Sequence, residues 1–160
     1  MTAYAYFDTF LGKMTMTAEK DALTGLWFTK DSEEMMPVTE SAVFGEAKRW
    51  LTRYFTGEKP DFSPKILLEG TAFRRIVWEI LLTIPYGETT TYGAVASEAA
   101  RIMGKARMSA QAAGGAIGHN PVCLIVPCHR VIGADGSLTG YAEGLWRKEA
   151  LLRLESTGHI

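Results

Sequence analysis

A proline-containing segment at residues 58–64 divides the chain into two stretches whose apolar residues follow different patterns. Apolar residues recur at helical spacing from Val43 to Phe55, and Gly57 ends that run. Before this helix, three short runs rich in apolar and β-branched residues predict strands, at residues 3–10, 14–18 and 23–29. The first stretch is therefore predicted to form a small α/β domain, residues 1–64, with the segment as its linker.

The second stretch, residues 65–160, is predicted to be mostly helical. Its first three helical runs each follow a residue type that commonly caps a helix, namely Thr71, Thr91 and Ser109. Helices are predicted from Thr71 and over residues 92–103, 110–118 and 146–155. The second and third of these are joined by Gly104 and a basic loop, which is a helix-turn-helix pattern.

The run Ile-Val-Pro-Cys-His-Arg-Val-Ile, residues 125–132, places Cys128 between a proline and a histidine. A thiol becomes a strong nucleophile as the thiolate, and a nearby base or positive charge favours that form. His129 and Arg130 are candidates for both. Residues 123–126 are predicted to be a buried strand that ends near Cys128. The run alone leaves open a second interpretation, in which Cys128 is a packed core thiol.

The cysteine and histidine content argues against a disulfide or a metal site. Cys123 and Cys128 lie five residues apart in a run predicted to be extended, so we expect no disulfide between them. The chain has no Cys-x-x-Cys pair, and its three histidines are not spaced as a ligand set, so we expect no metal and no cofactor. No signal peptide and no apolar run of about 20 residues is evident, which predicts a cytoplasmic protein without membrane contact.

The acidic residues are distributed unevenly, although the formal net charge is only −1. From Ala99 to Ala134 there is no aspartate or glutamate, while four basic residues lie in this window: Arg101, Lys105, Arg107 and Arg130. Such a window is a modest indication of a polyanion partner, with chance clustering as the alternative. Alanine and glycine dominate residues 110–118, which would let a DNA strand or a packed helix approach closely.

Several short motifs have a distinctive order and spacing: Asn120-Pro121, Pro127-Cys128-His129-Arg130-Val131-Ile132, Gly140-Tyr141, Arg147-Lys148-Glu149 and Glu155. With these motifs, the chain resembles the methylated-DNA–protein-cysteine methyltransferases, the O6-alkylguanine-DNA alkyltransferase family. The resemblance covers nearly the whole chain and is strongest over residues 73–155. It implies an α/β N-terminal domain and a mostly helical C-terminal domain with helix-turn-helix, winged-helix-like DNA-binding architecture.

The resemblance implies direct DNA repair by irreversible alkyl transfer. A thiolate suits attack on the carbon of an O6-alkyl group, and the product would be a stable thioether on Cys128. No hydrolysis step releases it, so each molecule would act once. The implied substrate is O6-alkylguanine, with O4-alkylthymine as a further candidate.

The resemblance also assigns roles beside Cys128. It implies that His129 is the base, acting on the thiol through a water, and that Glu155 orients His129. It implies that Asn120 binds backbone groups and holds the segment that carries Cys128. Taken alone, Glu155 is more typical of a solvated carboxylate at a helix end, and the alternative for Asn120 is an ordinary turn residue before a proline.

The implied partner is double-stranded DNA that carries an alkylated guanine, bound by a monomer. The base must leave the stack to meet the thiol, and the resemblance implies that Tyr92 helps to rotate it out. It implies that the helix at 110–118 enters the minor groove. Ser109 and Arg130 are candidate contacts to the DNA backbone, with helix capping and surface solvation as alternatives.

Four residues match positions that line the family's guanine pocket: Ile117, Val131, Tyr141 and Ala142. Core packing is an equal alternative for Ile117 and Val131. Two residues depart from the family pattern. Gln111 stands where the family often has an arginine that fills the gap left by the flipped base, which predicts weaker DNA binding. Glu143 stands at the pocket rim where the family usually has glycine, which predicts a narrower range of substrates.

Three other functions stay open at this point. A DNA-lesion-binding protein without efficient transfer would bind the damaged duplex without gaining mass. A thiol hydrolase would use Cys128 and His129 with turnover on small acyl substrates. A helix-turn-helix transcription factor would bind undamaged DNA in a sequence-specific way, although residues 110–118 offer few side chains that read bases.

Overall fold

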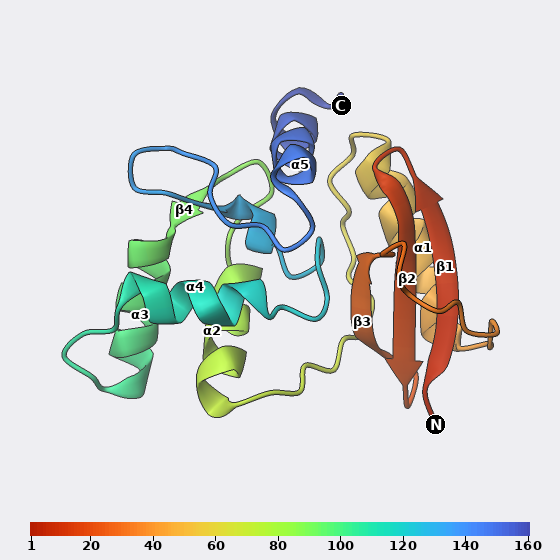
Figure 1. The fold of residues 1–160 in the computed structure, drawn as a ribbon, viewed down its shortest axis with the longest axis horizontal. Helices are drawn as coiled ribbons and strands as arrows, with labels where there is room; N and C mark the ends of the chain where they lie inside the picture. The colour runs from red at the N-terminus through yellow and green to blue at the C-terminus, as the bar shows by residue number, and fades with distance from the viewer.

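The computed structural model describes residues 1–160, and the chain forms two parts that lie side by side (Figure 1). The N-terminal part is a three-stranded antiparallel sheet in the order β1-β2-β3, covered by one helix. Its elements are β1 (Ala3–Thr9), β2 (Gly12–Glu19), β3 (Ala22–Phe28) and α1 (Ala42–Phe55). The three predicted strands and the predicted helix are confirmed, with ends shifted by one or two residues.

The C-terminal part is built from four helices, α2 (Ala72–Leu82), α3 (Tyr92–Met103), α4 (Ala110–Gly118) and α5 (Leu145–Thr157). Each of the three predicted caps is present: the side chains of Thr71, Thr91 and Ser109 accept hydrogen bonds from backbone N–H groups of the first turn. Gly104 ends α3 with φ +69°, a left-handed conformation that glycine adopts without strain. Because these local signals are strong, α3 and α4 span the predicted residues.

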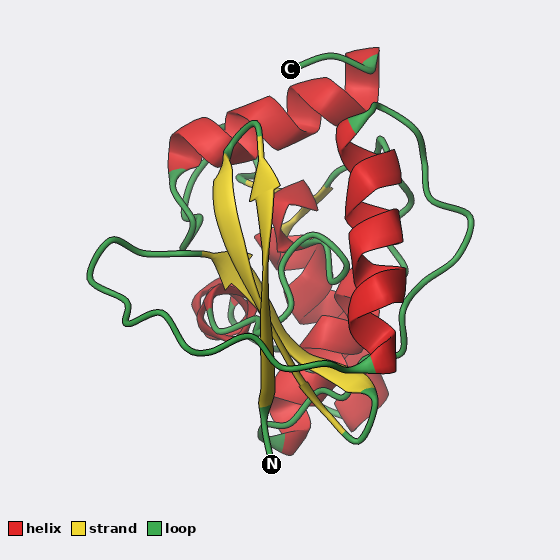
Figure 2. Ribbon diagram, turned by 90° about the vertical axis from the view of Figure 1, so that its right-hand side faces the viewer, coloured by secondary structure: helices red, strands yellow, loops and turns green.

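The predicted fold class, an α/β N-terminal part followed by a mostly helical C-terminal part, is confirmed. In the view turned by 90°, the strands lie in front of the C-terminal helices (Figure 2). No helix is both long enough and apolar enough to cross a bilayer.

The two parts share one hydrophobic core. A single cluster of 36 buried residues runs from Ala5 in β1 to Leu154 in α5. The edge of β3 that does not pair with β2 faces the C-terminal part and bonds to it. Leu26 N–H donates to Pro121 O, and Cys123 N–H donates to Leu26 O, each at 2.9 Å. The segment that precedes Cys128 is therefore fixed directly against the N-terminal sheet.

The prediction of a strand over residues 123–126 is wrong. The chain folds back on itself there: Val126 N–H donates to Val122 O at 3.0 Å, and Leu124 has φ +71°. A 3-10 helix, η1 (Cys128–Arg130), follows, and then the two-residue strand β5 (Val131–Ile132) pairs in parallel with β4 (Thr90–Thr91). Tertiary contacts hold this compact turn, although its apolar sequence is typical of a strand.

Candidate active site

Cys128 lies at the start of η1, beside a small internal hollow. The side chain is buried, with 8% of the residue exposed. The hollow has a volume of about 20 Å³, enough for roughly one water molecule. Nine residues line it: Ile117, Gly118, Asn120, Cys123, Cys128, Gly140, Tyr141, Ala142 and Glu143. Residues from α4, the Asn120 turn and the loop before α5 thus meet at the thiol.

Glu155 lies on α5 and is the centre of a buried hydrogen-bond network. Its Oε2 atom lies 2.5 Å from His129 Nε2 and accepts from the Tyr54 hydroxyl at 2.6 Å. Its Oε1 atom accepts from Gly87 N–H at 3.0 Å and from Arg130 Nε at 2.8 Å. A buried carboxylate is stable only when its oxygens are this well satisfied. The solvated-carboxylate interpretation of Glu155 is therefore wrong.

These contacts fix the tautomer of His129. Burial alone would raise the pKa of Glu155, but the hydrogen bonds and charges of His129 and Arg130 lower it to about 2. An ionised carboxylate only accepts hydrogen bonds, so His129 Nε2 carries the proton and donates it. Burial also lowers the pKa of His129, which favours the neutral ring. The Nδ1 atom is then an acceptor, and this buried atom has no protein partner. His129 is thus arranged to accept one proton at Nδ1.

The Cys128 thiol is protonated at neutral pH. Burial raises its pKa to about 11, and the nearby Asn120 side chain and Lys148 charge oppose this only in part. A thiolate therefore forms at neutral pH only if a base takes the proton. His129 is the next residue in η1, and its Nδ1 atom has no protein partner.

Asn120 fixes the turn that carries Cys128. Its Nδ2 atom donates to Val126 O at 2.8 Å, and its Oδ1 atom accepts from Val122 N–H at 3.0 Å. One side chain therefore joins the two ends of the fold-back before η1. This arrangement agrees with the expectation that Asn120 binds backbone groups in the segment that carries Cys128.

Arg130 does not lie where the sequence placed it. It is buried, with 8% of the residue exposed, and its guanidinium pairs with Glu155 and donates to Ile84 O at 2.7 Å. All of these partners are internal, so its position does not support the predicted contact to the DNA backbone. This inward position results from tertiary structure, because η1 turns the Arg130 side chain toward α5, where the buried carboxylate of Glu155 needs a positive partner.

Two buried residues near the site were given no role from the sequence. Tyr54 belongs to α1, 75 residues before His129, and its hydroxyl lies 3.3 Å from His129 Nε2. Lys148 is fully buried in α5, and its Nζ atom donates to Val131 O at 2.5 Å and to Thr139 O at 2.9 Å. Tyr54 has helical spacing typical of a core residue. Lys148 belongs to the motif Arg147-Lys148-Glu149, but its charged neighbours gave no sign that its side chain is buried.

Of the predicted DNA-contacting residues, Ser109 and Gln111 are exposed at the start of α4. The Ser109 hydroxyl accepts from Ala112 N–H at 3.0 Å, so the side chain also caps α4. Tyr92, the first residue of α3, is half-buried, and its hydroxyl donates to Thr139 O at 2.7 Å. Tyr92 thus holds the loop that leads to the hollow beside Cys128.

The predicted pocket residues are only partly brought together. Ile117, Tyr141, Ala142 and Glu143 line the hollow beside Cys128. Val131 does not line it: the residue is fully buried in β5, and its carbonyl accepts from Lys148. The core-packing interpretation therefore fits Val131 better than a pocket role.

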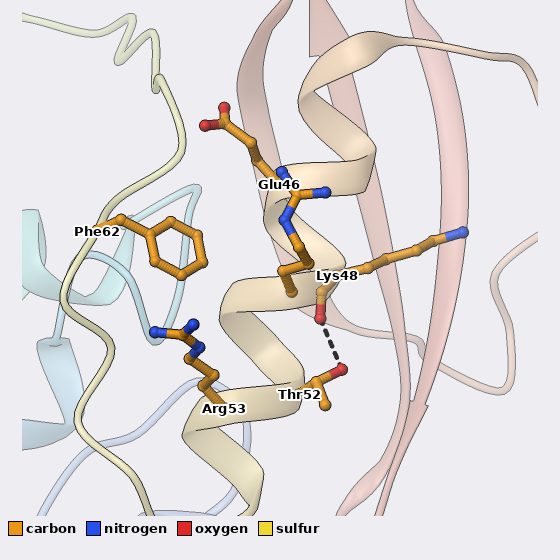
Figure 3. A pocket seen from close by; sticks show the side chains of 6 residues that line it. Glu46, Lys48, Thr52, Arg53 and Phe62 are labelled. Atoms are coloured by element: carbon orange, nitrogen blue, oxygen red, sulfur yellow. Dashed lines mark hydrogen bonds between the residues drawn. The ribbon is translucent and has the colours of Figure 1, made fainter.

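A larger hollow of about 570 Å³ lies elsewhere, between α1 and the segment that contains Phe62 (Figure 3). Its lining is mostly charged or polar and comprises Glu46, Lys48, Arg49, Thr52, Arg53 and Phe62. It contains no cysteine, so it offers no thiol. No group of three or more metal-binding side chains is found in the structure.

Known proteins share both parts of the chain. Residues 2–68 match the ribonuclease-like domain of 6-O-methylguanine DNA methyltransferase, and residues 72–157 match the DNA-binding domain of the same family. The methylated-DNA–protein-cysteine methyltransferase of Mycobacterium tuberculosis is 42% identical over 98% of this chain and 94% of its own length. The enzyme of that name from Methanosarcina acetivorans is 44% identical over 96% of this chain and 98% of its own length.

Solved structures agree with these matches. The crystal structure of Mycobacterium tuberculosis O6-methylguanine methyltransferase has a TM-score of 0.84 and 42% identity, covering 98% of this chain and 94% of that one. The same organism's protein in complex with DNA has a TM-score of 0.85 and 41% identity with the same coverage. In sequence and in fold, the chain therefore belongs to the 6-O-methylguanine DNA methyltransferase family.

Proposed function

We propose that this protein repairs alkylated DNA directly, by moving the alkyl group from O6 of guanine to the Sγ atom of Cys128. The observation that carries the proposal is that His129, the residue next to the buried Cys128 thiol, has an Nδ1 atom without a hydrogen-bond partner. Family membership makes alkyl transfer the expected use of this pair. The protein is accordingly a single-turnover methylated-DNA–protein-cysteine methyltransferase.

The step begins with a proton transfer. A water between the two side chains accepts the thiol proton and passes one to His129 Nδ1, while Glu155 stabilises the resulting imidazolium through Nε2. The thiolate attacks the alkyl carbon in line, so the S–C bond forms while the C–O6 bond breaks and O6 keeps the electron pair. The proton held by His129 then neutralises the guanine. The thioether product resists hydrolysis, because its alkyl carbon is a weak electrophile and the thiolate a poor leaving group, so each molecule acts once.

The proposed partner is double-stranded DNA with an alkylated guanine, bound by one copy of this chain. The small residues of α4 suit entry into the minor groove, and Ser109 and Gln111 at its exposed start suit contacts to the DNA. Tyr92 is the residue proposed to favour rotation of the damaged nucleotide out of the stack. The free thiols of Cys123 and Cys128 fit a reducing cytoplasm. The proposed domain boundary lies at residues 64–65.

The decisive experiment is intact-mass spectrometry after incubation with a duplex that carries one O6-methylguanine. We expect a gain of one methyl group per protein, and peptide mapping should place it on Cys128. The matched variants are Cys128→Ser, which should abolish the gain, and Cys123→Ala, which removes the other thiol of the same hollow and should keep it. No gain in mass with the duplex still bound would instead favour the lesion-binding protein without transfer.

A further inference from the structure

The edge of β3 that does not pair with β2 is covered by three separate segments that follow α1. Leu23 N–H donates to Lys65 O at 2.9 Å, and Leu26 N–H donates to Pro121 O at the same distance. The next outward donor on this edge is the N–H of Phe28, and it donates to the side chain of Glu143, whose Oε2 atom lies 3.2 Å away. The side chain of a residue in the active-site loop thus takes the place of a strand partner.

The fold-back before Cys128 explains why β3 needs this carboxylate. In a regular parallel pairing, the carbonyl of Cys123 would be the next acceptor for β3. Here it accepts from Ile125 N–H at 2.9 Å within the turn instead. Phe28 is almost fully buried, with 1% of the residue exposed, and a buried N–H without a partner is costly. Glu143 satisfies this donor across 115 residues of sequence.

Arg147 strengthens the same connection. Its Nε atom donates to Leu11 O at 2.9 Å, and its Nη1 atom donates to Glu143 O at 3.0 Å. Its guanidinium lies 4.3 Å from the centre of the Phe28 ring. The loop before α5 is therefore tied to the N-terminal sheet through the carboxylate of Glu143 and through the guanidinium of Arg147.

Glu143 also lines the hollow beside Cys128, together with Tyr141 and Ala142. This hollow, about 20 Å³, is far smaller than the several hundred Å³ typical of a site that encloses a ligand. A flipped guanine therefore fits only after the lining has moved, and the rim at residues 140–143 is the part of it that belongs to the loop before α5. The other end of this loop is held from within the C-terminal part, by Tyr92 and Lys148 at Thr139.

We propose that Glu143 is a specificity-determining residue that latches the rim of the alkyl pocket to Phe28 of the N-terminal sheet. The latch sets how far the rim opens, and so favours small O6-alkyl groups over bulky ones. A methyl group demands the least opening beyond that needed for the base. A benzyl group demands more, and its entry breaks the hydrogen bond to Phe28. The proposal rests on the proposed alkyl transfer to Cys128.

The charge of Glu143 has a second effect that the test must separate from the latch. Its negative charge contributes to the raised pKa of Cys128, so any neutral replacement also makes the thiol more reactive. Glu143→Gln and Glu143→Ala are both neutral, but only glutamine keeps an oxygen that can accept from Phe28 N–H. The comparison between these two variants therefore removes the effect of charge. Because Glu143 lines the hollow, Glu143→Leu, which has about the size of glutamine but no acceptor, separates the hydrogen bond from the space that alanine adds: it should behave like Glu143→Ala, and a match to Glu143→Gln would overturn the latch.

The experiment measures single-turnover transfer from one duplex that carries either O6-methylguanine or O6-benzylguanine. We expect Glu143→Ala to raise the benzyl-to-methyl rate ratio about tenfold, the factor expected for one hydrogen bond to a charged group. Glu143→Gln should raise both rates together and keep the ratio within about threefold of the wild type. A ratio in Glu143→Ala that matches Glu143→Gln would overturn the latch.

A second measurement does not depend on the transferase activity. The rate at which N-ethylmaleimide labels Cys128, followed by peptide mapping, should be several-fold higher in Glu143→Ala than in Glu143→Gln, and equal rates would overturn the latch. If the wild type transfers no methyl group at all, the proposed function fails, yet this labelling comparison still decides whether Glu143 holds the rim. Thermal unfolding of both variants checks that the rates come from folded protein.

Discussion

The N-terminal and C-terminal parts contribute to the site in different ways. The C-terminal part supplies the groups proposed to react or to move a proton, Cys128 and His129, together with the carboxylate of Glu155. The N-terminal part supplies hydrogen bonds that position these groups, among them the Tyr54 hydroxyl to Glu155 and the Phe28 N–H to Glu143. The C-terminal part thus holds the proposed reacting groups, and the N-terminal part helps to fix their positions.

This difference sets the scale of the expected effects. Loss of a proton-transfer group costs orders of magnitude in rate. Loss of one positioning hydrogen bond costs about 1–2 kcal/mol, which is roughly a tenfold effect. If substitutions in the N-terminal part proved as damaging as those in the C-terminal part, this division of roles would be wrong.

The largest effect should come from Glu155→Gln. The amide brings its own N–H donors into a site where Tyr54, Gly87, His129 and Arg130 all donate. We expect transfer to slow about 100-fold and stability to fall by about 3–5 kcal/mol, because a buried charge pair is broken. Single-turnover kinetics and denaturant unfolding measure both effects, and binding to an undamaged duplex should be unchanged.

Glu149→Gln is the matched control on the same helix. Glu149 is exposed and pairs with Arg153 at 2.9 Å, so its loss should cost less than about 1 kcal/mol and leave transfer unchanged.

The wild type should also lose stability in acid. The folded pKa of Glu155, about 2, lies below its ordinary value of 4.5, so its stabilisation is present above pH 4.5 and is lost as the pH falls toward 2. The free energy of unfolding of the wild type and of Glu155→Gln is measured as the pH is lowered. If both proteins lost the same stability over this range, the ionised Glu155 carboxylate would not be the source of the stabilisation.

The next effect concerns the pH dependence of transfer. Burial lowers the pKa of His129 below its ordinary value of 6.5, and protonation at Nδ1 removes the acceptor. We expect the rate to stay level through neutral pH and to fall about tenfold per pH unit below that lowered pKa. Single-turnover rates between about pH 5 and pH 8 test this. A rate that climbs steadily across the whole range would mean that solvent, and not His129, removes the thiol proton.

A smaller effect is expected from Tyr54→Phe in the N-terminal part. The substitution removes the 2.6 Å hydrogen bond to Glu155 and keeps the ring stacked on Trp50. Stability should fall by about 1–2 kcal/mol and transfer should slow by less than about tenfold. The control is Tyr6→Phe, which removes a hydroxyl bonded to Met36 in the same part but away from the site. Equal losses of transfer in both variants would show that Tyr54 only supports the fold.

The smallest effect should come from Gln111→Arg at the exposed start of α4. An added positive charge that reaches a phosphate should tighten binding several-fold and make the dependence of log K on log salt about one unit steeper. Thr52→Arg adds the same charge to the exposed face of α1, in the N-terminal part, and should change neither quantity. Binding titrations at several salt concentrations compare them, and equal gains would indicate a non-specific charge effect.

Local signals made most of the fold predictable. The caps Thr71, Thr91 and Ser109 and the stop at Gly104 act within one helical turn, so the helices could be placed from the sequence. The turn around Leu124 could not, because a positive φ at an apolar residue depends on the surrounding contacts. The two-residue pair of β4 and β5 is too short to leave a periodic pattern.

The site was predictable where a motif carries it and not where distant residues complete it. Cys128, His129 and Asn120 stand within nine residues of one another, so their neighbourhood was visible in the sequence. Tyr54 looked like a core residue of α1, because the sequence does not show that its hydroxyl meets α5. Arg130 looked like a DNA contact, because a basic side chain in an acid-free run does not reveal its partner Glu155.

The pairing of Leu26 with Pro121 and Cys123 limits how this protein can be recombined. A chimaera that joined its nucleophile-bearing part to another relative's sheet would have to re-form this seam, because the backbone hydrogen bonds that fix the turn before Cys128 cross it. Such an exchange would probe register and not merely composition: a shift of one residue along β3 would turn every side chain of that strand to the opposite face. The two parts are therefore best exchanged as one unit, with the seam kept intact.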